Sequence, residues 1–515
     1  MSTVPSPDSP FRSIADLIRG HACERPRQSA LAQGDAVLDY GALDALMDRV
    51  AASLQRDGLR PGNDSIATCA GASPTYAALF LGALRAGIGV APLAPSVTPQ
   101  SFASMVGDAA PRWLFVDASA LDALGDRPSP VPCIALDERA PGTAFDTWLA
   151  PAGSKPAAVE VRPEWPFNII YSSGTTGTPK GIVQSHGMRW THVERGATYG
   201  YGADTVTLLA TPLYSNTTLV VFFPTLAFGG SVLLMPKFDA AGYVALAAKH
   251  RATHTMQVPV QYQRIMALAD FDRHDLASFR YKFCTSAPFA AALKADVVER
   301  WPGGLVEFYG MTEGGGTCIL EAHEHPTKLH TVGQPALGHD IRLIDDEGRE
   351  LPAGETGEVV GHSRGMMLGY HGQPAKTAEA EWFDPTGKRF IRTGDVGRFD
   401  GDGFLTLMDR KKDLVISGGF NIYPSDLETV LREHPAVADV AVVGVASVQW
   451  GETPVAFVVR RPAAEIGAGE LMRWLNQRVG KTQRLSSLQF LAELPRSAIG
   501  KVLKRELRDG YSAAG

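Results

Sequence analysis

The sequence predicts an α/β protein with a large N-terminal domain of α/β subdomains, a small β-barrel-like subdomain and a small α+β C-terminal domain. Three observations predict this architecture. Helical patterns alternate with short apolar runs up to about residue 340, short β-runs separated by turn residues follow, and a mixed α and β pattern returns after residue 410. A chain of 515 residues is long enough for two or more domains with sizeable cores.

The first part of the chain alternates helix and strand patterns, as α/β units around a largely parallel sheet do. The pattern LDYGALDALMDRVAASLQRDG at 38–58 is helical, whereas SIATCA at 65–70 and WLFVDA at 113–118 are short apolar runs typical of buried strands. The Pro- and Ala-rich stretch at 151–166 indicates a linker between subdomains, and NIIYSS at 168–173 indicates a short strand after it. The most apolar window, at 219–235, is broken by proline and glycine, which favours a buried helix, turn and strand over a membrane span.

The pattern of apolar and turn residues changes after about residue 340. The segments at 341–362 and 397–410 show short β-runs separated by DEG, AGE and DGDG turns, which predicts a small antiparallel, barrel-like subdomain. The segment at 414–445 returns to mixed α and β, and the charged run DRKKD before it is a natural boundary. We therefore expect an N-terminal domain at 1–409 and a C-terminal domain at 410–515.

Composition excludes several classes of protein. The net charge of −6 is small for this length, so the bulk electrostatics favour neither nucleic acid nor an anionic membrane as a partner. The five cysteines are scattered without paired spacing, which argues against a zinc cage or disulfide framework and suits a reducing cytosol. The N-terminal stretch has no basic region followed by an apolar core, so no secretory signal is evident. We expect a soluble cytoplasmic protein, monomer or homodimer, without a membrane segment or a nucleic-acid partner.

The loop YSSGTTGTPKGIV at 171–183 raises the first functional question. Gly174, Gly177 and Gly181 let the backbone approach a ligand, successive N–H groups can form an anion nest, and Lys180 adds a positive charge. Its hydroxyl donors are Ser172, Ser173, Thr175, Thr176 and Thr178. The loop is no Walker A motif, because that motif requires GK followed by Ser or Thr and this sequence has TPKG. Local chemistry leaves a phosphate-binding loop and a flexible connector as equal alternatives.

Two further motifs offer groups suited to a nucleotide. In EFYGMTEGGGT, Tyr309 can stack on a base, Thr312 can donate to a phosphate oxygen, and Glu313 is a hard ligand suited to Mg²⁺. In FIRTGDVGRFD, Asp395 can accept hydrogen bonds from a ribose diol. Taken alone, the first motif favours a turn with a capping Thr-Glu pair over a site, and the second is ordinary turn chemistry.

Two motifs near the C-terminal end complete the set. In SGGFN, Gly418 and Gly419 fit a narrow ligand tunnel, although the DRKKD run before them is by itself typical of a solvated loop. In LPRSAIGKVLKREL, Lys501 directly follows a glycine, whereas a lysine in a basic terminal helix is usually solvated surface. Neither motif carries a function alone.

Taken in order, YSSGTTGTPKG, TSAPF, YGMTE, TGD, DRKKDLVISGGFN and PRSAIGK resemble the adenylate-forming enzyme superfamily, and among its members an acid–CoA ligase most. This superfamily includes acyl- and aryl-CoA synthetases, adenylation domains of peptide synthetases, and beetle luciferases. The resemblance covers nearly the whole chain. It implies that a carboxylic acid attacks the α-phosphate of ATP to give an acyl-adenylate and pyrophosphate, and that a thiol, usually of coenzyme A, then displaces AMP. Mg²⁺ and a lysine would offset the repulsion between the two anions.

The resemblance implies a role for each motif. Residues of the first loop would hold the β- and γ-phosphates, and these are Ser172, Ser173, Gly174, Thr175, Thr176, Gly177 and Lys180. The adenine would lie between Ala287, Pro288 and Tyr309, and Asp395 and Arg410 would take the ribose hydroxyls. Thr312 would bond the α-phosphate, Glu313 would hold Mg²⁺, and Lys501 would bridge the carboxylate and the α-phosphate.

The resemblance also implies a mobile C-terminal domain that serves both half-reactions. One orientation brings Lys501 to the site, and the other brings the SGGFN face, where Gly418 and Gly419 leave room for the pantetheine arm. Lys412 falls at the position of the hinge.

By analogy, the acid pocket is formed by a mostly apolar lining with small residues. Its predicted members are Tyr214, Ser215, Asn216, Pro259, Tyr262, Thr285, Gly310 and the glycines 314 to 316 (Gly314, Gly315 and Gly316). Many acid–CoA ligases carry a His where Ser215 stands, so positioning of the carboxylate differs here. No cation is clearly placed for a second carboxylate, which disfavours malonate and favours an aryl, arylpropenoic or medium-chain monocarboxylate.

Two alternatives to an acid–CoA ligase have distinct signatures. The first alternative is a stand-alone enzyme that loads an amino acid or acyl group onto a carrier protein. The amino-acid activators among these enzymes place an Asp in the run that here reads YSNTT, and that Asp is absent. The acyl-AMP ligases among them carry an insertion that DRKKDLVISGGFN lacks. A nucleotide-binding regulator without catalysis is the other, but binding alone would not need Glu313, Lys412 and Lys501 together.

Overall fold

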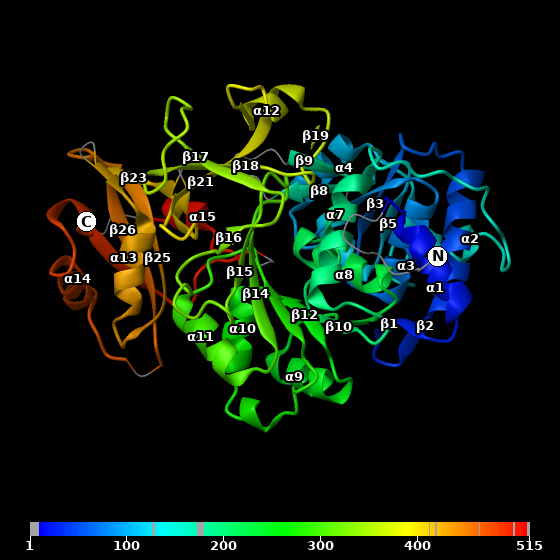
Figure 1. The fold of residues 1–515 in the computed structure, drawn as a ribbon, viewed down its shortest axis with the longest axis horizontal. Helices are drawn as coiled ribbons and strands as arrows, with labels where there is room; N and C mark the ends of the chain where they lie inside the picture. Colours follow the sequence, from blue (N-terminus) through cyan, green and yellow to red (C-terminus); the bar gives the residue numbers. More distant parts are fainter. Residues whose placement is uncertain are drawn as a thin grey trace. The chain divides into compact units, whose positions relative to one another are not determined.

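The computed structural model describes residues 10–125, 129–172, 180–410, 413–417, 420–462, 464–497 and 500–511 (Figure 1). The chain divides into two compact units. Unit 1 comprises Met1–His330, Pro335–Asp340 and Gly361–Ile391, and unit 2 comprises Thr331–Gln334, Ile341–Val360 and Arg392–Gly515. Unit 2 therefore includes strand residues that precede position 410, and the predicted boundary at 409/410 stays a prediction.

The first sheet runs in the order β16-β15-β14-β13-β12-β10-β11-β1-β2, where β16 is the short strand Gln334–Pro335 and the strands from β15 to β2 belong to unit 1. The strands from β14 to β1 pair in parallel, whereas β2 is antiparallel to β1 and β15 is antiparallel to β14. The strands are β1 (Ser29–Gln33), β2 (Ala36–Asp39), β10 (Val206–Leu209), β11 (Ser231–Leu234), β12 (His254–Gln257), β13 (Tyr281–Cys284), β14 (Gly304–Tyr309) and β15 (Cys318–Glu321). The carboxyl ends of β13 and β14 lead into the TSAPF and YGMTE motifs, so these two motifs lie at one edge of the sheet.

The second sheet of unit 1 runs in the order β19-β9-β8-β4-β3-β5-β6-β7. It is parallel from β8 to β7, whereas β9 is antiparallel to both β8 and β19. The strands are β3 (Ser65–Cys69), β4 (Gly89–Leu93), β5 (Leu114–Val116), β6 (Cys133–Ala135), β7 (Thr143–Ala144), β8 (Pro166–Ser172), β9 (Lys180–Ser185) and β19 (Gly369–Tyr370).

The helices of unit 1 pack against these sheets. They are α1 (Ile14–Glu24), α2 (Tyr40–Arg56), α3 (Pro74–Arg85), α4 (Pro99–Ala109), α5 (Leu121–Leu124), α6 (Phe145–Trp148), α7 (His186–Gly196), α8 (Asn216–Ala227), α9 (Ala240–Lys249), α10 (Pro259–Met266), α11 (Ala291–Arg300) and α12 (Pro374–Glu379). One buried hydrophobic cluster contains residues of both sheets and of α1, α2, α3 and α8. The predicted helix at 38–58 is confirmed as α2, and the apolar window at 219–235 forms α8 and β11. Among the described residues, none of the helices is both long and apolar enough to cross a membrane.

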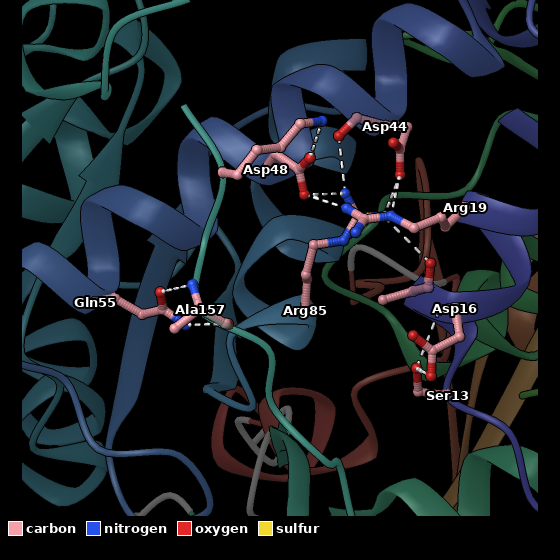
Figure 2. A network of polar contacts seen from close by, with 10 residues as sticks. Ser13, Asp16, Arg19, Asp44, Asp48, Gln55, Arg85 and Ala157 are labelled. Carbon is pink, nitrogen blue, oxygen red and sulfur yellow. Dashed lines mark hydrogen bonds and ion pairs between the residues drawn. The ribbon is translucent and has the colours of Figure 1, made fainter. Parts of the chain in front are cut away.

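A network of charges around the buried Asp48 and Arg85 joins α1, α2 and α3 (Figure 2). Arg85 of α3 donates to Asp44 at 2.5 Å and to Asp48 at 2.9 Å, and Arg19 of α1 pairs with both carboxylates. Lys155, from the segment predicted as a linker, donates to Asp48 at 2.8 Å. Burial by itself raises the pKa of Asp48, but the hydrogen bond from Lys155 and the charges of Arg85 and Arg19 outweigh it, and the pKa is lowered. The network therefore fixes three helices and the linker to one another.

The strands of the turn-rich region form a sheet in the order β17-β18-β21-β20, with β22 paired to β21. The pairs β20–β21 and β21–β22 are antiparallel, as the turn-rich pattern predicts. The strands of this sheet are β17 (Asp340–Ile344), β18 (Thr356–His362), β20 (Glu381–Phe383), β21 (Arg389–Phe399) and β22 (Leu405–Arg410). β21 pairs with β22 within unit 2, and its first residues pair with β20 within unit 1.

The C-terminal part of unit 2 is a second α+β structure with its own buried cores. Its sheet runs in the order β24-β23-β26-β25, and β27 adds to β26 in parallel. The elements are β23 (Val415–Ser417), β24 (Phe420–Ile422), α13 (Pro424–Arg432), β25 (Val437–Ser447), β26 (Gly451–Arg460), α14 (Ala468–Asn476), β27 (Ser487–Leu491) and α15 (Lys504–Asp509). The predicted change from short β-runs to mixed α and β after residue 410 is confirmed.

Candidate active site

The loop of the first motif is carried by two paired strands. β8 and β9 are antiparallel, and Ser172 and Lys180 are register partners, so the two ends of the loop are held side by side. Ser173, Gly174, Thr175, Thr176 and Gly177 lie outside the described residues, and their predicted phosphate contacts stay predictions.

Lys180 and Glu313 meet at a third residue, Tyr370 of β19. The Lys180 Nζ lies 4.9 Å from the centroid of the Tyr370 ring, and the Tyr370 hydroxyl donates to Glu313 Oε1 at 2.8 Å. Burial, and then the Glu313 charge, raise the pKa of Tyr370, so this hydroxyl stays protonated and acts as the donor. The structure thus brings the loop lysine and the carboxylate of YGMTE to one place.

The YGMTE turn is fixed by close contacts of its glycines. Gly314 has φ +75°, and a Cβ there would lie 1.9 Å from the Gly365 carbonyl oxygen. A Cβ on Gly315 would lie 2.9 Å from the Gly361 carbonyl oxygen. We predicted these glycines as small pocket residues. The structure gives a more immediate reason for them, because neighbouring backbone occupies the space that a side chain would need. Their role in the pocket stays a prediction.

The TSAPF segment follows β13 and is held in a strained turn. Ser286 has φ +83°, which side chains rarely adopt, and its hydroxyl lies 2.6 Å from that of Thr217 on α8. Thr285 Oγ1 donates to the Phe308 carbonyl at 2.7 Å, which joins the segment to the end of β14. These two contacts fix the turn that directly precedes Ala287 and Pro288. Tyr309, the third residue predicted to contact the adenine, is the last residue of β14.

The remaining predicted pocket residues differ in exposure. Ser215 is buried and half-buried Asn216 begins α8, while the half-buried Tyr214 lies near Ser96 and Cys69. Pro259 begins α10, and Tyr262 is fully buried with its hydroxyl donating to the Phe283 carbonyl at 2.9 Å. Gly310 lies directly after β14, with a Cβ position 3.2 Å from the Gly316 carbonyl oxygen. The assignment of all these residues to an acid pocket stays a prediction.

Sequence reasoning missed a buried polar network beneath these motifs. Gln184 of β9 donates to the Thr312 carbonyl at 2.7 Å and to Asn216 Oδ1 at 3.4 Å. Its own oxygen accepts from Asn168 at 3.0 Å and from Arg189. Burial lowers the pKa of Arg189 to about 9. A glutamine inside the apolar strand GIVQS was the available signal, because a polar residue at a buried position needs partners.

Unit 2 carries the predicted ribose and lysine motifs. Asp395 and Arg410 are register partners across β21 and β22, and the Arg410 Nε lies 3.1 Å from Asp395 Oδ1. Lys501 stands in a tight turn, where its N–H donates to Ser497 Oγ at 3.2 Å and its carbonyl accepts from the Ser497 N–H at 2.8 Å. Gly500 before it has φ +76°. The predicted hinge Lys412 and the glycines of SGGFN, Gly418 and Gly419, lie outside the described residues.

Asp409, next to Arg410, has an unusual environment. Its carboxylate accepts from the Ser425 N–H at 2.6 Å and lies 3.8 Å from the Lys504 Nζ, which also contacts Glu428 at 2.9 Å. Burial raises the pKa of Asp409 to about 6, and the charge of Lys504 offsets this only in part. The carboxyl of Asp409, which precedes the predicted hinge Lys412 by three positions, therefore titrates closer to neutral pH than an ordinary aspartate.

Glu313 fits the divalent cation that its motif implies. Within the described part of the chain, no group of three or more His, Cys, Asp or Glu could hold a metal ion by itself. Mg²⁺ is commonly bound by one or two carboxylates together with water and substrate phosphates, so a single half-buried carboxylate near Lys180 of the predicted phosphate loop suits this ion.

Comparison with known proteins decides the family. The sequence matches the AMP-binding enzyme family over residues 18–371 and the AMP-binding enzyme C-terminal domain over residues 426–501. The chain belongs to the AMP-binding enzymes. Feruloyl-CoA synthase from an Amycolatopsis species is 33% identical over 510 residues, covering 94% of this chain and 96% of the relative. The fatty acid–[acyl-carrier-protein] ligase ScoC of Streptomyces coeruleorubidus is 30% identical over 515 residues, covering 97% of each chain.

A solved structure agrees with this placement. ATP-bound MatB from Rhodopseudomonas palustris superposes with a TM-score of 0.86 at 29% identity, covering 97% of this chain and 99% of that one. The predicted membership of the adenylate-forming superfamily and the predicted fold class are confirmed. This AMP-binding enzyme is a ligase of that superfamily, and its family uses ATP.

Proposed function

We propose that this AMP-binding enzyme is an acid–CoA ligase. The carboxylate oxygen of the acid attacks the α-phosphorus of ATP, the bond to pyrophosphate breaks, and an acyl-adenylate forms. The thiol of coenzyme A then attacks the acyl carbon, AMP leaves, and the thiol proton passes to solvent. The observation that carries the first step is the meeting of Lys180 and Glu313 at Tyr370, beside Thr312.

In the first step, two anions must come together. Lys180 supplies positive charge toward the β- and γ-phosphates, and Thr312 donates to the α-phosphate. Glu313 would hold Mg²⁺, which when bound neutralises phosphate charge. The hydrogen bond from Tyr370 orients the Glu313 carboxylate, and the hydrogen bond from Gln184 orients the Thr312 backbone.

The motifs of unit 2 take the remaining roles. Asp395 and Arg410 bind the ribose hydroxyls, and Lys501 bridges the carboxylate and the α-phosphate during adenylation. Rotation about Lys412 exchanges Lys501 for the face with Gly418 and Gly419, where the pantetheine arm enters. The tight turn around Lys501 supports this proposal, because it holds the lysine backbone in one position.

The acid is an aryl, arylpropenoic or medium-chain carboxylic acid. The similarity to feruloyl-CoA synthase favours an aromatic acid and coenzyme A as acceptor. The similarity to a fatty acid–[acyl-carrier-protein] ligase supports a second candidate, an enzyme that loads an acyl group onto a carrier protein. The two candidates share the adenylation step and differ only in the thiol.

The experiment is a pyrophosphate-release screen over a panel of carboxylic acids, with and without coenzyme A. Release of pyrophosphate with at least one acid is expected, together with AMP formation that depends on coenzyme A. AMP formation that requires an acylatable carrier protein and ignores coenzyme A would select the second candidate. Failure of every acid to release pyrophosphate would contradict both.

Two substitutions separate the half-reactions. Lys501→Ala is expected to lower the rate of adenylation by about 10²-fold or more, while a synthetic acyl-adenylate is still converted to thioester. Gly419→Leu is expected to do the reverse, since a bulky side chain would block the pantetheine arm. Equal loss of both half-reactions in either variant would contradict the role assigned to that residue.

A further inference from the structure

Beside the YGMTE turn stands a group of hydrogen-bond donors that form no ion pair with a carboxylate of the described residues. α7 carries Arg189, His192 and Arg195 at three-residue spacing, which places them along one side of the helix, and His339 lies close to them. We name these four residues the basic cluster. Among the described residues, no carboxylate forms an ion pair with Arg189 or Arg195, whereas Glu194 of the same helix is paired with Arg364 at 2.9 Å.

The two histidines of the basic cluster are neutral and act as donors. His339 Nδ1 accepts from the Thr317 N–H at 2.9 Å, so its proton resides on Nε2. His192 Nδ1 faces the Arg189 guanidinium at 3.5 Å, and because a guanidinium only donates, this ring also carries its proton on Nε2. Burial, and then Arg195, lower the pKa of His339 to about 4 and that of His192 well below its usual range. Both rings therefore present an N–H group at neutral pH.

Arg189 and Arg195 differ in how far the protein satisfies them. Arg189 is fully buried, and its guanidinium donates to Asn168 Oδ1 at 3.1 and 3.0 Å and to Gln184, so it belongs to the network under Thr312. The Arg195 guanidinium lies 4.5 Å from the centroid of the Phe308 ring, with Tyr199 and Tyr201 nearby. Aromatic rings compensate a desolvated cation only in part, so Arg195 retains capacity for an anionic partner.

The basic cluster flanks the segment that carries the proposed catalytic residues. Arg195 packs on Phe308, directly before Tyr309, and His339 binds Thr317, directly after the glycine turn. Arg195, His192 and His339 are each half-buried, so solvent still reaches them although burial depresses the pKa of each. The donors of the basic cluster therefore lie beside both ends of the segment 308–317, which carries Thr312.

We propose that the acid carries an anionic oxygen group, a carboxylate or a phenolate, at the end distant from the reacting carboxylate, and that Arg195 with the Nε2–H groups of His192 and His339 binds it. This inference rests on the proposed function and names the substrate class of the same site. Arg195 supplies the distal cation that the sequence pattern did not reveal. An apolar tail would leave this cation and two N–H groups without acceptors, so the same site disfavours plain aliphatic acids.

The test compares matched acids that differ only at the far end. Adenylation is measured with 4-carboxycinnamate, 4-hydroxycinnamate and 4-methylcinnamate, and kcat/KM for each oxygen-bearing acid is divided by that for the methyl acid. At least one ratio is expected to exceed about 10 in the wild-type enzyme and to fall about tenfold or more in Arg195→Met. A preference for 4-carboxycinnamate assigns a carboxylate, and a preference for 4-hydroxycinnamate that strengthens at high pH assigns a phenolate. Ratios near one, or ratios unchanged by Arg195→Met, overturn the proposal.

Arg280→Met serves as the matched control, because Arg280 is an arginine of unit 1 that is already paired with Asp204. Arg280→Met is expected to leave both kcat/KM ratios within about twofold of their wild-type values. His339→Asn is a second variant, in which the amide oxygen can still accept from the Thr317 N–H while the Nε2–H donor is lost; a fall of about threefold or more in the preferred ratio is expected. An unchanged ratio in His339→Asn removes that residue from the site.

A binding measurement separates this inference from the proposed function. Calorimetric titration of 4-carboxycinnamate and 4-hydroxycinnamate into the wild-type protein is expected to give Kd values about tenfold or more below those of Arg195→Met for the preferred acid. If no acid releases pyrophosphate, the proposed function fails, and the titration still decides the inference. Equal Kd values for the wild-type protein and Arg195→Met overturn the inference.

Discussion

Replacing Gln184 tests whether the buried polar network positions Thr312. Gln184→Met keeps a similar volume but removes four hydrogen-bonding contacts, to Thr312, Asn216, Asn168 and Arg189. Three groups lose a partner, namely the Thr312 carbonyl, the Asn168 amide and one N–H of Arg189. Each group left without a partner costs about 1–3 kcal/mol, so the free energy of unfolding should fall by about 3–9 kcal/mol. Typical domains are stable by about 5–15 kcal/mol, so this is a large fraction.

Gln184→Met should also lower the rate of adenylation. Without its donor the Thr312 backbone can shift, and a displacement of about 1 Å at a reacting group costs about 10²-fold in rate. The assay combines urea unfolding with pyrophosphate release at saturating ATP. Gln184→Glu is the matched control, since it keeps acceptors for Arg189 and Asn168 but cannot donate to Thr312 when ionised. Gln184→Glu should retain most of the free energy of unfolding and lose most of the rate of pyrophosphate release. A Gln184→Met enzyme with stability within about 1 kcal/mol of wild type and full kcat would refute the reasoning.

Two further predictions concern single contacts. Tyr370→Phe removes the hydroxyl that donates to Glu313 Oε1 and should lower kcat for adenylation about 5- to 30-fold, since a charge-assisted hydrogen bond is worth about 1–2 kcal/mol. Tyr243→Phe, which removes a hydroxyl bonded to Thr255, is the control, and equal rates for the two variants would contradict the role of Tyr370. Burial raises the pKa of Asp409 in the folded state to about 6, above its ordinary value of 3.8, so the native state binds the extra proton and stability falls as pH rises from about 4 to 6. Asp409→Asn should abolish that loss, at most about 3 kcal/mol, in urea unfolding followed across this pH range; an unchanged pH slope would exclude Asp409 as its source.

Sequence patterns predicted the elements that local chemistry specifies. α2 begins at a capping Asp39 that accepts from the Ala42 N–H at 2.7 Å, and the strand before the phosphate loop is β8. The polar and glycine-rich motifs likewise lie at strand ends, because β13 and β14 are neighbours in a parallel array. These features depend on residues close together in the chain, so periodicity and turn chemistry suffice to find them.

The residues that sequence reasoning missed depend on contacts between distant segments. Tyr370 reaches Glu313 only because β19 pairs with β9, and a tyrosine in LGYHG carries no local signal of this. Arg195 reads as an ordinary basic residue near a helix end until Phe308 and His339 are placed around it. The glycines of the YGMTE turn were read as pocket residues, whereas contacts with the backbone at 361 and 365 also require them. Tertiary packing, which the local pattern does not encode, decides each of these cases.

The charge network of α1, α2 and α3 has a consequence for tolerance to mutation. Arg85 and Arg19 each contact both Asp44 and Asp48, so loss of one carboxylate leaves every arginine with the other. Lys155 depends on Asp48 alone, and its side chain is 69% exposed, so water can replace that contact. Redundancy of this kind allows individual positions to drift during evolution while the three helices keep their places. Only simultaneous loss of both carboxylates would leave the buried Arg85 without an acidic partner.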